Sequence, residues 1–280
     1  MKKRPEEEYK MTTSKEITNI KEALAAAGVT EDTLTEEEKT SLDEQGFVMF
    51  HDLIAPESIK KIQDRFEELF AEEGDRAGME VHQEKGTRRL SDLMNKGEIF
   101  DEIYMNPKIL AGMYHIIGRD FKMSAMNGRD VLKGQGLQPL HEDWNDFNEG
   151  DGDMREPEDP FHVANSLVML DDFTPDNGPT RVVPGTHKMK APQFYLDDRE
   201  APHPDEIKVL GKAGSAIVFN SHLWHGGTTS QSDAKRRVLH PYYVAREYPQ
   251  QQDQMKYIRK ETYDRISPAA RYILDVMGAY

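Results

Sequence analysis

Hydrophobic residues in the first part of the chain recur every three or four positions, the period of an amphipathic helix. Capping-box pairs, Thr13 with Glu16 and Thr35 with Glu38, stand ahead of two such stretches. Pro56 and Asn106-Pro107 occupy first-turn positions of two more. Glycines that can end these four helices are Gly28, Gly46, Gly74 and Gly118. We therefore expect helices over residues 35–118, with a short strand at 47–50.

From about residue 121 the pattern changes to short runs of β-type residues separated by Gly, Pro, Asn and Asp. The runs lie at 121–126, 129–133, 138–143, 163–170, 180–183, 206–210, 215–219 and 237–244. Many short strands at close spacing predict a sandwich or barrel-like β core over 121–244. Residues 249–280 return to helix-like composition. The fold class predicted is mainly β with flanking helices.

No linker rich in Gly and Ser divides the chain, so we predict one domain over residues 31–280. Residues 1–30 are expected to form an N-terminal helical extension that is free to move. The acidic stretch 146–160 is rich in Gly and Pro and lacks the residue order of a calcium loop. We interpret it as a solvated loop and as a candidate lid over a nearby site.

Composition and charge narrow the functional classes. The chain has 280 residues, 36 basic and 51 acidic, with a formal net charge of −15. Such an acidic protein repels phosphate backbones and anionic lipids, which argues against nucleic-acid or membrane binding. The absence of cysteine excludes disulfides and thiolate chemistry. The charged start and the lack of an apolar run of about 18 residues predict neither a secretory signal nor a membrane span, and hence a cytoplasmic protein.

The segment from Gln138 to Trp144 carries the first candidate chemistry. On a strand, His141 and Asp143 project to one face, whereas Glu142 projects to the other. An imidazole and a carboxylate one strand step apart can hold the same metal ion. A His-x-Asp pair is common by chance, so a metal site needs support from a second segment of the chain.

The second element follows the apolar run 216–219, where His222 and His225 precede two glycines. Two histidines and one carboxylate form the facial triad of non-haem iron(II) oxygenases. Eleven residues after His225 lies Arg236, next to Arg237. A guanidinium near such a metal suits the second carboxylate of a dicarboxylate co-substrate, which it can bind bidentately.

Together these segments resemble the phytanoyl-CoA dioxygenase-like family of iron(II)- and 2-oxoglutarate-dependent oxygenases. The resemblance runs from about Thr35 to Tyr243 and includes GQGLQPLHEDW, Leu170-Asp171-Asp172-Phe173, NGPTRVVPGTHK and WHGG with its trailing arginine. It implies a double-stranded β-helix core, also described as a jelly-roll or cupin-like core. It also implies an enzyme that uses Fe(II), 2-oxoglutarate and O2, and releases succinate and CO2.

The resemblance assigns roles to single residues. It makes His141, Asp143 and His225 the iron ligands, and Arg236 the partner of the distal 2-oxoglutarate carboxylate. Gln138 and Thr180 match further co-substrate positions. The family spacing favours Arg236 over Arg237, and His225 over His222. His187 is interpreted as structural, and Glu142 as a residue off the metal face. Asp143 argues against the halogenase variant, which has a small residue there.

Several points stay open at this stage. Trp144 and Trp224 adjoin the proposed ligands, and each suits either the core or a pocket wall. The substrate is expected to be a small organic metabolite that is hydroxylated at a C–H bond. Basic residues that can form a local patch are interpreted as solvated instead: Arg88, Arg89, Arg129 and Lys133. The alternatives are a cupin-type isomerase or lyase without 2-oxoglutarate, and a non-catalytic metal or ligand sensor.

Overall fold

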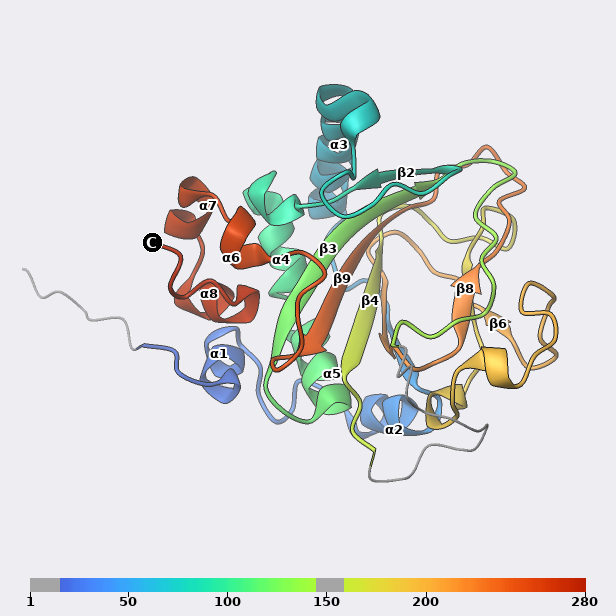
Figure 1. Cartoon of the computed structure of the whole chain (residues 1–280), viewed down its shortest axis with the longest axis horizontal. Helices are drawn as coiled ribbons and strands as arrows, with labels where there is room; N and C mark the ends of the chain where they lie inside the picture. The colour runs from blue at the N-terminus through green and yellow to red at the C-terminus, as the bar shows by residue number, and fades with distance from the viewer. Residues whose placement is uncertain (1–15, 145–158) are drawn as a thin grey trace, which may run out of the picture.

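The computed structural model describes residues 16–144 and 159–280 (Figure 1). The helices are α1 Ile20–Ala26, α2 Glu36–Glu44, α3 Pro56–Glu73, α4 Asp101–Tyr104, α5 Pro107–Ile117, α6 Gln254–Tyr257, α7 Lys260–Arg265 and α8 Pro268–Leu274. The strands are β1 Phe47–Phe50, β2 Thr87–Leu90, β3 Phe121–Val131, β4 Val163–Met169, β5 Thr180–Val182, β6 Ile207–Lys208, β7 Ala216–Asn220, β8 His225–Gly227 and β9 Arg237–Ala245.

The strands form two antiparallel sheets that make up a jelly-roll core, as predicted. The larger sheet has six strands in the order β1-β7-β4-β9-β3-β2, and the smaller has three in the order β6-β5-β8. Helices cover one side of the larger sheet, and the smaller sheet lies on its other side (Figure 1). The space between the sheets holds the candidate site.

The helix boundaries follow from capping chemistry. Thr35 and Glu38 form the predicted capping box, with both reciprocal hydrogen bonds present. Pro56 begins α3, and the Asn106 side chain caps α5 by accepting from the backbone N–H of Lys108. The first helix differs from the prediction. It begins at Ile20 with Asn19 as its cap, and the predicted cap Thr13 lies outside the described residues.

The strand predictions need three corrections. The runs 121–126 and 129–133 belong to one strand, β3, which contains a bulge between Met123 and Ala125. The run 138–143 is an irregular segment that is tied to β8 by a single bridge between His141 and His225. Strands β2 and β8 were not predicted, because both are short and depend on pairing with distant segments.

Strand alternation divides the larger sheet into a helix side and a cavity side. On β4, for example, Ala164 and Val168 belong to the core under the helices, whereas Leu167 and Met169 belong to a smaller cluster between the sheets. Residues of α1 and α8 belong to the core on the helix side of the sheet, and the two helices contact each other. The described part of the N-terminal segment, 16–30, therefore packs on the body of the protein.

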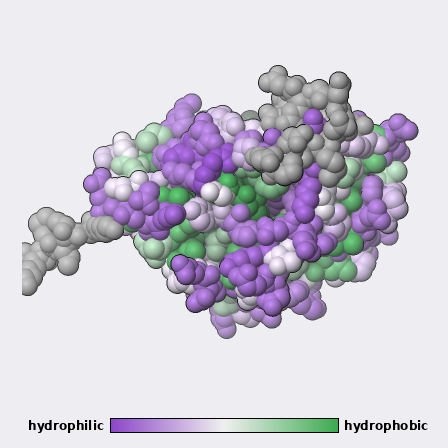
Figure 2. Space-filling view, turned by 90° about the horizontal axis from the view of Figure 1, so that it is seen from below, coloured by the Kyte–Doolittle hydropathy of each residue, from purple (hydrophilic) through white to green (hydrophobic). Residues whose placement is uncertain are grey.

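Two predictions fall on residues that are not described. These are the mobility of residues 1–15 and the lid, of which 159–160 alone are described. In the described part of the chain, no helix combines the length and apolar character that crossing a bilayer requires. Hydrophilic residues dominate the face shown in Figure 2, in line with the high net charge.

Candidate metal and co-substrate site

A cavity of about 230 Å³ lies between the two sheets. Its wall combines the metal-binding motif with residues from β3, β9 and the segment before β2. The residues that line it are His82, Arg89, Asn127, Arg129, Gln138, His141, Asp143, Leu167, Thr180, Phe219, His225, Gly226, His240, Tyr242 and Gln251.

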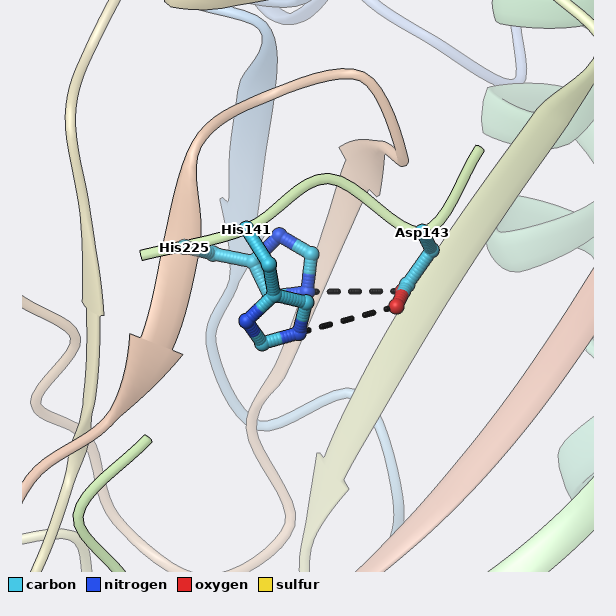
Figure 3. Close-up of side chains that lie close together, drawn as sticks. All are labelled: His141, Asp143 and His225. Atoms are coloured by element: carbon cyan, nitrogen blue, oxygen red, sulfur yellow. Dashed lines mark ion pairs between the residues drawn. The ribbon is translucent and has the colours of Figure 1, made fainter. Parts of the chain in front are cut away.

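His141, Asp143 and His225 converge at this cavity (Figure 3). One ligand atom from each lies within 4.8 Å of the others. The Asp143 carboxylate lies 3.7 Å from Nε2 of His141 and 3.4 Å from Nε2 of His225. Among the described residues this is the group of histidine and acidic side chains with the spacing of a metal site. Two imidazoles and one carboxylate suit a divalent first-row transition metal.

The backbone holds the two histidines side by side. The N–H of His141 donates to the carbonyl of His225 at 2.9 Å, and the N–H of His225 donates to the carbonyl of His141 at 3.0 Å. The N–H of Asp143 donates to the carbonyl of Ser221 at 2.8 Å. These bonds fasten an otherwise irregular segment to β8 and to the turn before it. The spacing of the three side chains is therefore set by the main chain.

Both histidines are held in the tautomer that metal binding needs. Nδ1 of His141 lies 2.8 Å from the carbonyl of Pro139, and Nδ1 of His225 lies 2.8 Å from the carbonyl of Leu223. A carbonyl only accepts hydrogen bonds, so each Nδ1 carries the proton. Each Nε2 then presents its lone pair to the cavity.

The charges of the site support a neutral His141 and an anionic Asp143. Burial and the neighbouring His225 lower the pKa of His141 to about 4, so this ring is neutral at neutral pH. Burial opposes the charge on Asp143, but His225 and His141 outweigh it and hold the pKa of that carboxyl well below its usual range. Burial also disfavours protonated His225, but the Asp143 charge prevails and raises its pKa. Asp143 can thus offer an anionic ligand, and the donor set fits iron(II).

Asn165 on β4 supports the carboxylate and was not found by the sequence analysis. Its side-chain N–H donates to Oδ2 of Asp143, and the residue is fully buried. Such a bond fixes the orientation of a ligand carboxylate. The alternation of β4 places Asn165 on the cavity face. Because Asn165 is far along the chain from His141 and Asp143, the sequence alone did not indicate this contact.

Arg236 is a buried guanidinium without a carboxylate partner among the described residues. It is 2% exposed, its Nη2 donates to Oγ1 of Thr180 at 2.8 Å, and it stacks on the Phe173 ring at 4.1 Å. Its Nε has no hydrogen-bond partner within the described structure. Burial lowers the pKa of Arg236 to about 9, which leaves it charged at neutral pH. A buried charge of this kind calls for an anionic ligand.

Arg237 has a different environment. Its guanidinium binds both carboxylate oxygens of Asp171, at 2.7 and 2.9 Å, and also contacts Glu67 of α3 at 3.1 Å. These contacts lie on the helix side of the sheet. The two neighbouring arginines thus point to opposite faces of the sheet.

Gln138 and Thr180 both line the cavity. The side-chain oxygen of Gln138 accepts from the N–H of Gly227 at 3.0 Å, so its amide N–H groups remain as donors. Next to Thr180, the buried Arg181 donates to the carbonyl of Gln138 at 3.0 Å and forms an ion pair with Glu206. Arg181 therefore holds the irregular segment against the smaller sheet.

Neither tryptophan lines the cavity. Trp224 precedes His225 on the chain and faces the other way, where its Nε1 donates to the carbonyl of Lys190 and its ring packs on Tyr195. Trp144 packs against His162 and Tyr248, with ring centroids 4.8 and 4.7 Å apart. Polar residues form the wall in their place.

The other two histidines of the motif segments lie outside the ligand cluster. His222 is fully buried with its Nδ1 4.0 Å from Glu142, which is itself buried off the metal face. The Nε2 of His187 lies 3.2 Å from the carbonyl of Asp43. A Cβ at Gly46 would lie 2.5 Å from Nδ1 of His187, so this histidine packs tightly against the backbone just before β1.

Much of the far end of the cavity was not predicted from the sequence. Arg89 and Arg129, interpreted as solvated, are largely buried in its wall, together with Asn127 and His240. Arg88 is half-buried and pairs with Asp130, and Lys133 is exposed as expected. The pairing of β2 with β3 brings Arg89 and Arg129 together, and nothing in the local sequence reveals that register.

Comparison with known proteins gives consistent results. The family model described as phytanoyl-CoA dioxygenase (PhyH) matches residues 42–238. Dioxygenase trt7 of Aspergillus terreus is 28% identical over 71% of this chain and 69% of its own. Dioxygenase cdmD of Talaromyces verruculosus is 26% identical over 83% of this chain and 81% of its own.

Solved structures show the same fold. HygX from Streptomyces hygroscopicus, crystallised with nickel and 2-oxoglutarate, superposes with a TM-score of 0.62. The match covers 78% of this chain and 89% of HygX at 18% identity. HygX has also been crystallised with iron bound.

Proposed function

This chain belongs to the phytanoyl-CoA dioxygenase family of iron(II)- and 2-oxoglutarate-dependent dioxygenases, and we propose that it hydroxylates a C–H bond of a small organic metabolite. The observation that carries this proposal is the convergence of two imidazoles and one carboxylate within 4.8 Å beside a cavity. A small-molecule substrate agrees with the binding of hygromycin B by HygX.

We assign His141, Asp143 and His225 as the iron ligands. With iron(II) bound, the centre would supply O2 activation coupled to the conversion of 2-oxoglutarate into succinate and CO2. Three protein ligands leave coordination positions free for the co-substrate and O2. The two Nδ1–H bonds to main-chain carbonyls hold the imidazole rings in place, and Asn165 orients the carboxylate.

We assign Arg236 to the distal carboxylate of 2-oxoglutarate, with Thr180 and Gln138 as further hydrogen-bonding partners. Arg236 is buried, charged and without an acidic partner in the described residues, and Thr180 connects it to the cavity wall. A charge-assisted bond of this kind contributes about 1.5–3 kcal/mol. The same charge would partly balance the dianion.

Two side chains in the largely polar wall of the cavity are apolar. Leu167 and Phe219 line the cavity, and the Phe219 ring centroid lies 5.1 Å from that of His225. Both side chains belong to the hydrophobic cluster between the sheets. They keep water from the reacting centre and from the substrate C–H bond.

The test uses purified protein loaded with Fe(II) under anaerobic conditions. Addition of 2-oxoglutarate should produce the metal-to-ligand charge-transfer absorption of this enzyme class. Admission of O2 with a library of metabolites should then give substrate-dependent succinate. Binding of 2-oxoglutarate without that absorption contradicts the ligand assignment, and product formed without succinate would point to a cupin-type isomerase or lyase.

A further inference from the structure

The far end of the cavity contains two arginines in direct opposition. Arg89 on β2 pairs in register with Arg129 on β3, and both side chains line the cavity. They are largely buried, with side-chain exposures of 7% and 12%. Like charges directly opposite on one face of a sheet are destabilising. The guanidinium groups of Arg89 and Arg129 therefore need a negative charge between them.

A single carboxylate in the described structure meets this need in part. Glu84 accepts from Nε and Nη2 of Arg129, and from Nη1 of Arg89 at 3.0 Å. Arg129 is thereby bound bidentately, whereas Arg89 makes one of its possible bonds. The Nε of Arg89 is buried and has no hydrogen-bond partner within the described residues. Arg89 therefore keeps donors for a ligand.

The charge balance of the loaded cavity points the same way. Iron(II) and the 2-oxoglutarate dianion cancel each other, and Asp143 cancels Arg236. At the far end, Arg89 and Arg129 face the single carboxylate of Glu84, which leaves one positive charge, and Arg129 also lies within electrostatic range of Arg236. An uncompensated charge in a site of low dielectric favours a ligand of opposite sign.

We propose that Arg89 and Arg129 recognise a carboxylate on the substrate, so that the enzyme oxidises a small organic acid. This inference rests on the proposed function and names its substrate class. Asn127 and Gln251 also line the cavity and can donate hydrogen bonds to the same molecule. The described cavity of about 230 Å³ has to hold iron and 2-oxoglutarate as well, so we expect the acid to be small.

Arg89 and Arg129 could also bind a carboxylate of 2-oxoglutarate instead of one on the substrate. A first experiment distinguishes these two ligands. The affinity for 2-oxoglutarate is measured from the charge-transfer absorption of the anaerobic Fe(II) protein. We expect Arg236→Gln to weaken this affinity at least about tenfold and Arg89→Gln to change it less than about threefold. A tenfold loss in Arg89→Gln assigns the pair to the co-substrate and overturns the proposal.

The second experiment measures charge preference. Short aliphatic and aromatic monocarboxylates, each paired with its primary amide, are titrated into the anaerobic Fe(II)–2-oxoglutarate protein, and the shift of the absorption band reports binding. We expect the preferred acid to bind at least about tenfold more tightly than its amide, and Arg89→Gln to abolish the difference. Arg88→Gln is the matched control, since Arg88 points to the helix side and pairs with Asp130 and Glu67.

Glu84→Gln should change acid binding in the direction opposite to Arg89→Gln. It removes the carboxylate between the arginines while keeping the side-chain shape, so it should increase acid binding by about threefold or more. A purely structural role for Glu84 predicts weaker binding of acid and amide alike. A panel in which no acid binds more tightly than its amide overturns the proposal. If the charge-transfer band itself does not form, the proposed function fails instead.

Discussion

The larger sheet presents two different surfaces to its two sides. On the helix side, β3, β4, β7 and β9 contribute apolar residues to one continuous core with α1, α3, α5 and α8. This surface is packed tightly. A Cβ placed at Gly128 would lie 2.3 Å from the Phe66 ring of α3. Charged residues on this side are matched with partners, as Arg237 is with Asp171 and Glu67.

On the cavity side, the larger sheet and the residue before β9 carry polar side chains with spare hydrogen-bonding capacity. Arg89, Arg236 and His240 each have a buried nitrogen without a partner in the described residues. Unpaired buried polar groups cost stability, so a fold keeps them where a ligand completes their bonding. The difference shows that one set of strands separates the residues that stabilise the fold from those that bind. Substitutions on the two sides should therefore affect different measurements.

The largest effect is expected for Asp143→Ala on the cavity side. Removing the anionic ligand should weaken Fe(II) or Mn(II) binding more than about 100-fold and abolish 2-oxoglutarate turnover. The Tm of the metal-free protein should stay within about 2 °C. Titration calorimetry, succinate assays and thermal unfolding check this. Asp172→Ala, which removes a surface carboxylate bonded to Lys212, is the control. Retained turnover in Asp143→Ala excludes that residue from the ligand set.

The neighbouring residues Arg236 and Arg237 test the difference between the cavity side and the helix side most directly. Arg236→Gln should raise the 2-oxoglutarate concentration needed for half-maximal turnover by about 10- to 100-fold, with little change in Tm. Arg237→Gln should lower the free energy of unfolding by about 3 kcal/mol, because it leaves Asp171 without its buried partner, and spare the 2-oxoglutarate affinity. Steady-state kinetics and denaturant titration distinguish the two. The reverse ranking shows that the roles are exchanged.

A packing variant tests the helix side alone. Gly128→Ala should lower the free energy of unfolding by about 1–3 kcal/mol, because the new methyl group overlaps the Phe66 ring. Iron and 2-oxoglutarate affinities should not change in the folded protein. Gly278→Ala is the control, since a Cβ there has no neighbour within 4 Å among the described residues. A loss of ligand affinity without a loss of stability would contradict the separation of the two sides.

The smallest effect is expected for Asn165→Ala. Loss of its bond to Asp143 leaves the carboxylate free to rotate and should weaken metal binding by about tenfold. Ser166→Ala changes the next residue of β4, which faces the helix side, and serves as control. A spectroscopic readout, such as the EPR spectrum of bound Mn(II), separates a change in coordination from a general loss of stability. Unchanged metal affinity in Asn165→Ala would limit this residue to packing.

The parts of this arrangement that depend on local sequence could be predicted. The capping box at Thr35 and the proline at Pro56 determine helix starts through contacts within one turn. His141 and Asp143 are two residues apart, and their common direction follows from extended backbone. The family pattern added His225 and Arg236, which no local rule joins to them.

The parts that depend on strand register could not be predicted. Arg89 meets Arg129 because β2 pairs with β3, and Asn165 on β4 bonds Asp143 on the irregular segment before β4. Both contacts join residues more than 20 positions apart on the printed sequence. Trp224 shows the same limit, since its direction away from the cavity follows from the formation of β8 around His225.

The paired main chains of His141 and His225 have a consequence for metal choice. Two backbone hydrogen bonds set the distance between the imidazoles, so the main chain organises this part of the site for coordination. A rigid pocket of two nitrogens and one carboxylate does not discriminate among late first-row cations, whose affinities follow the Irving–Williams order. Nickel and copper should therefore displace iron in vitro. Metal availability in the cell should therefore contribute to which ion the enzyme carries.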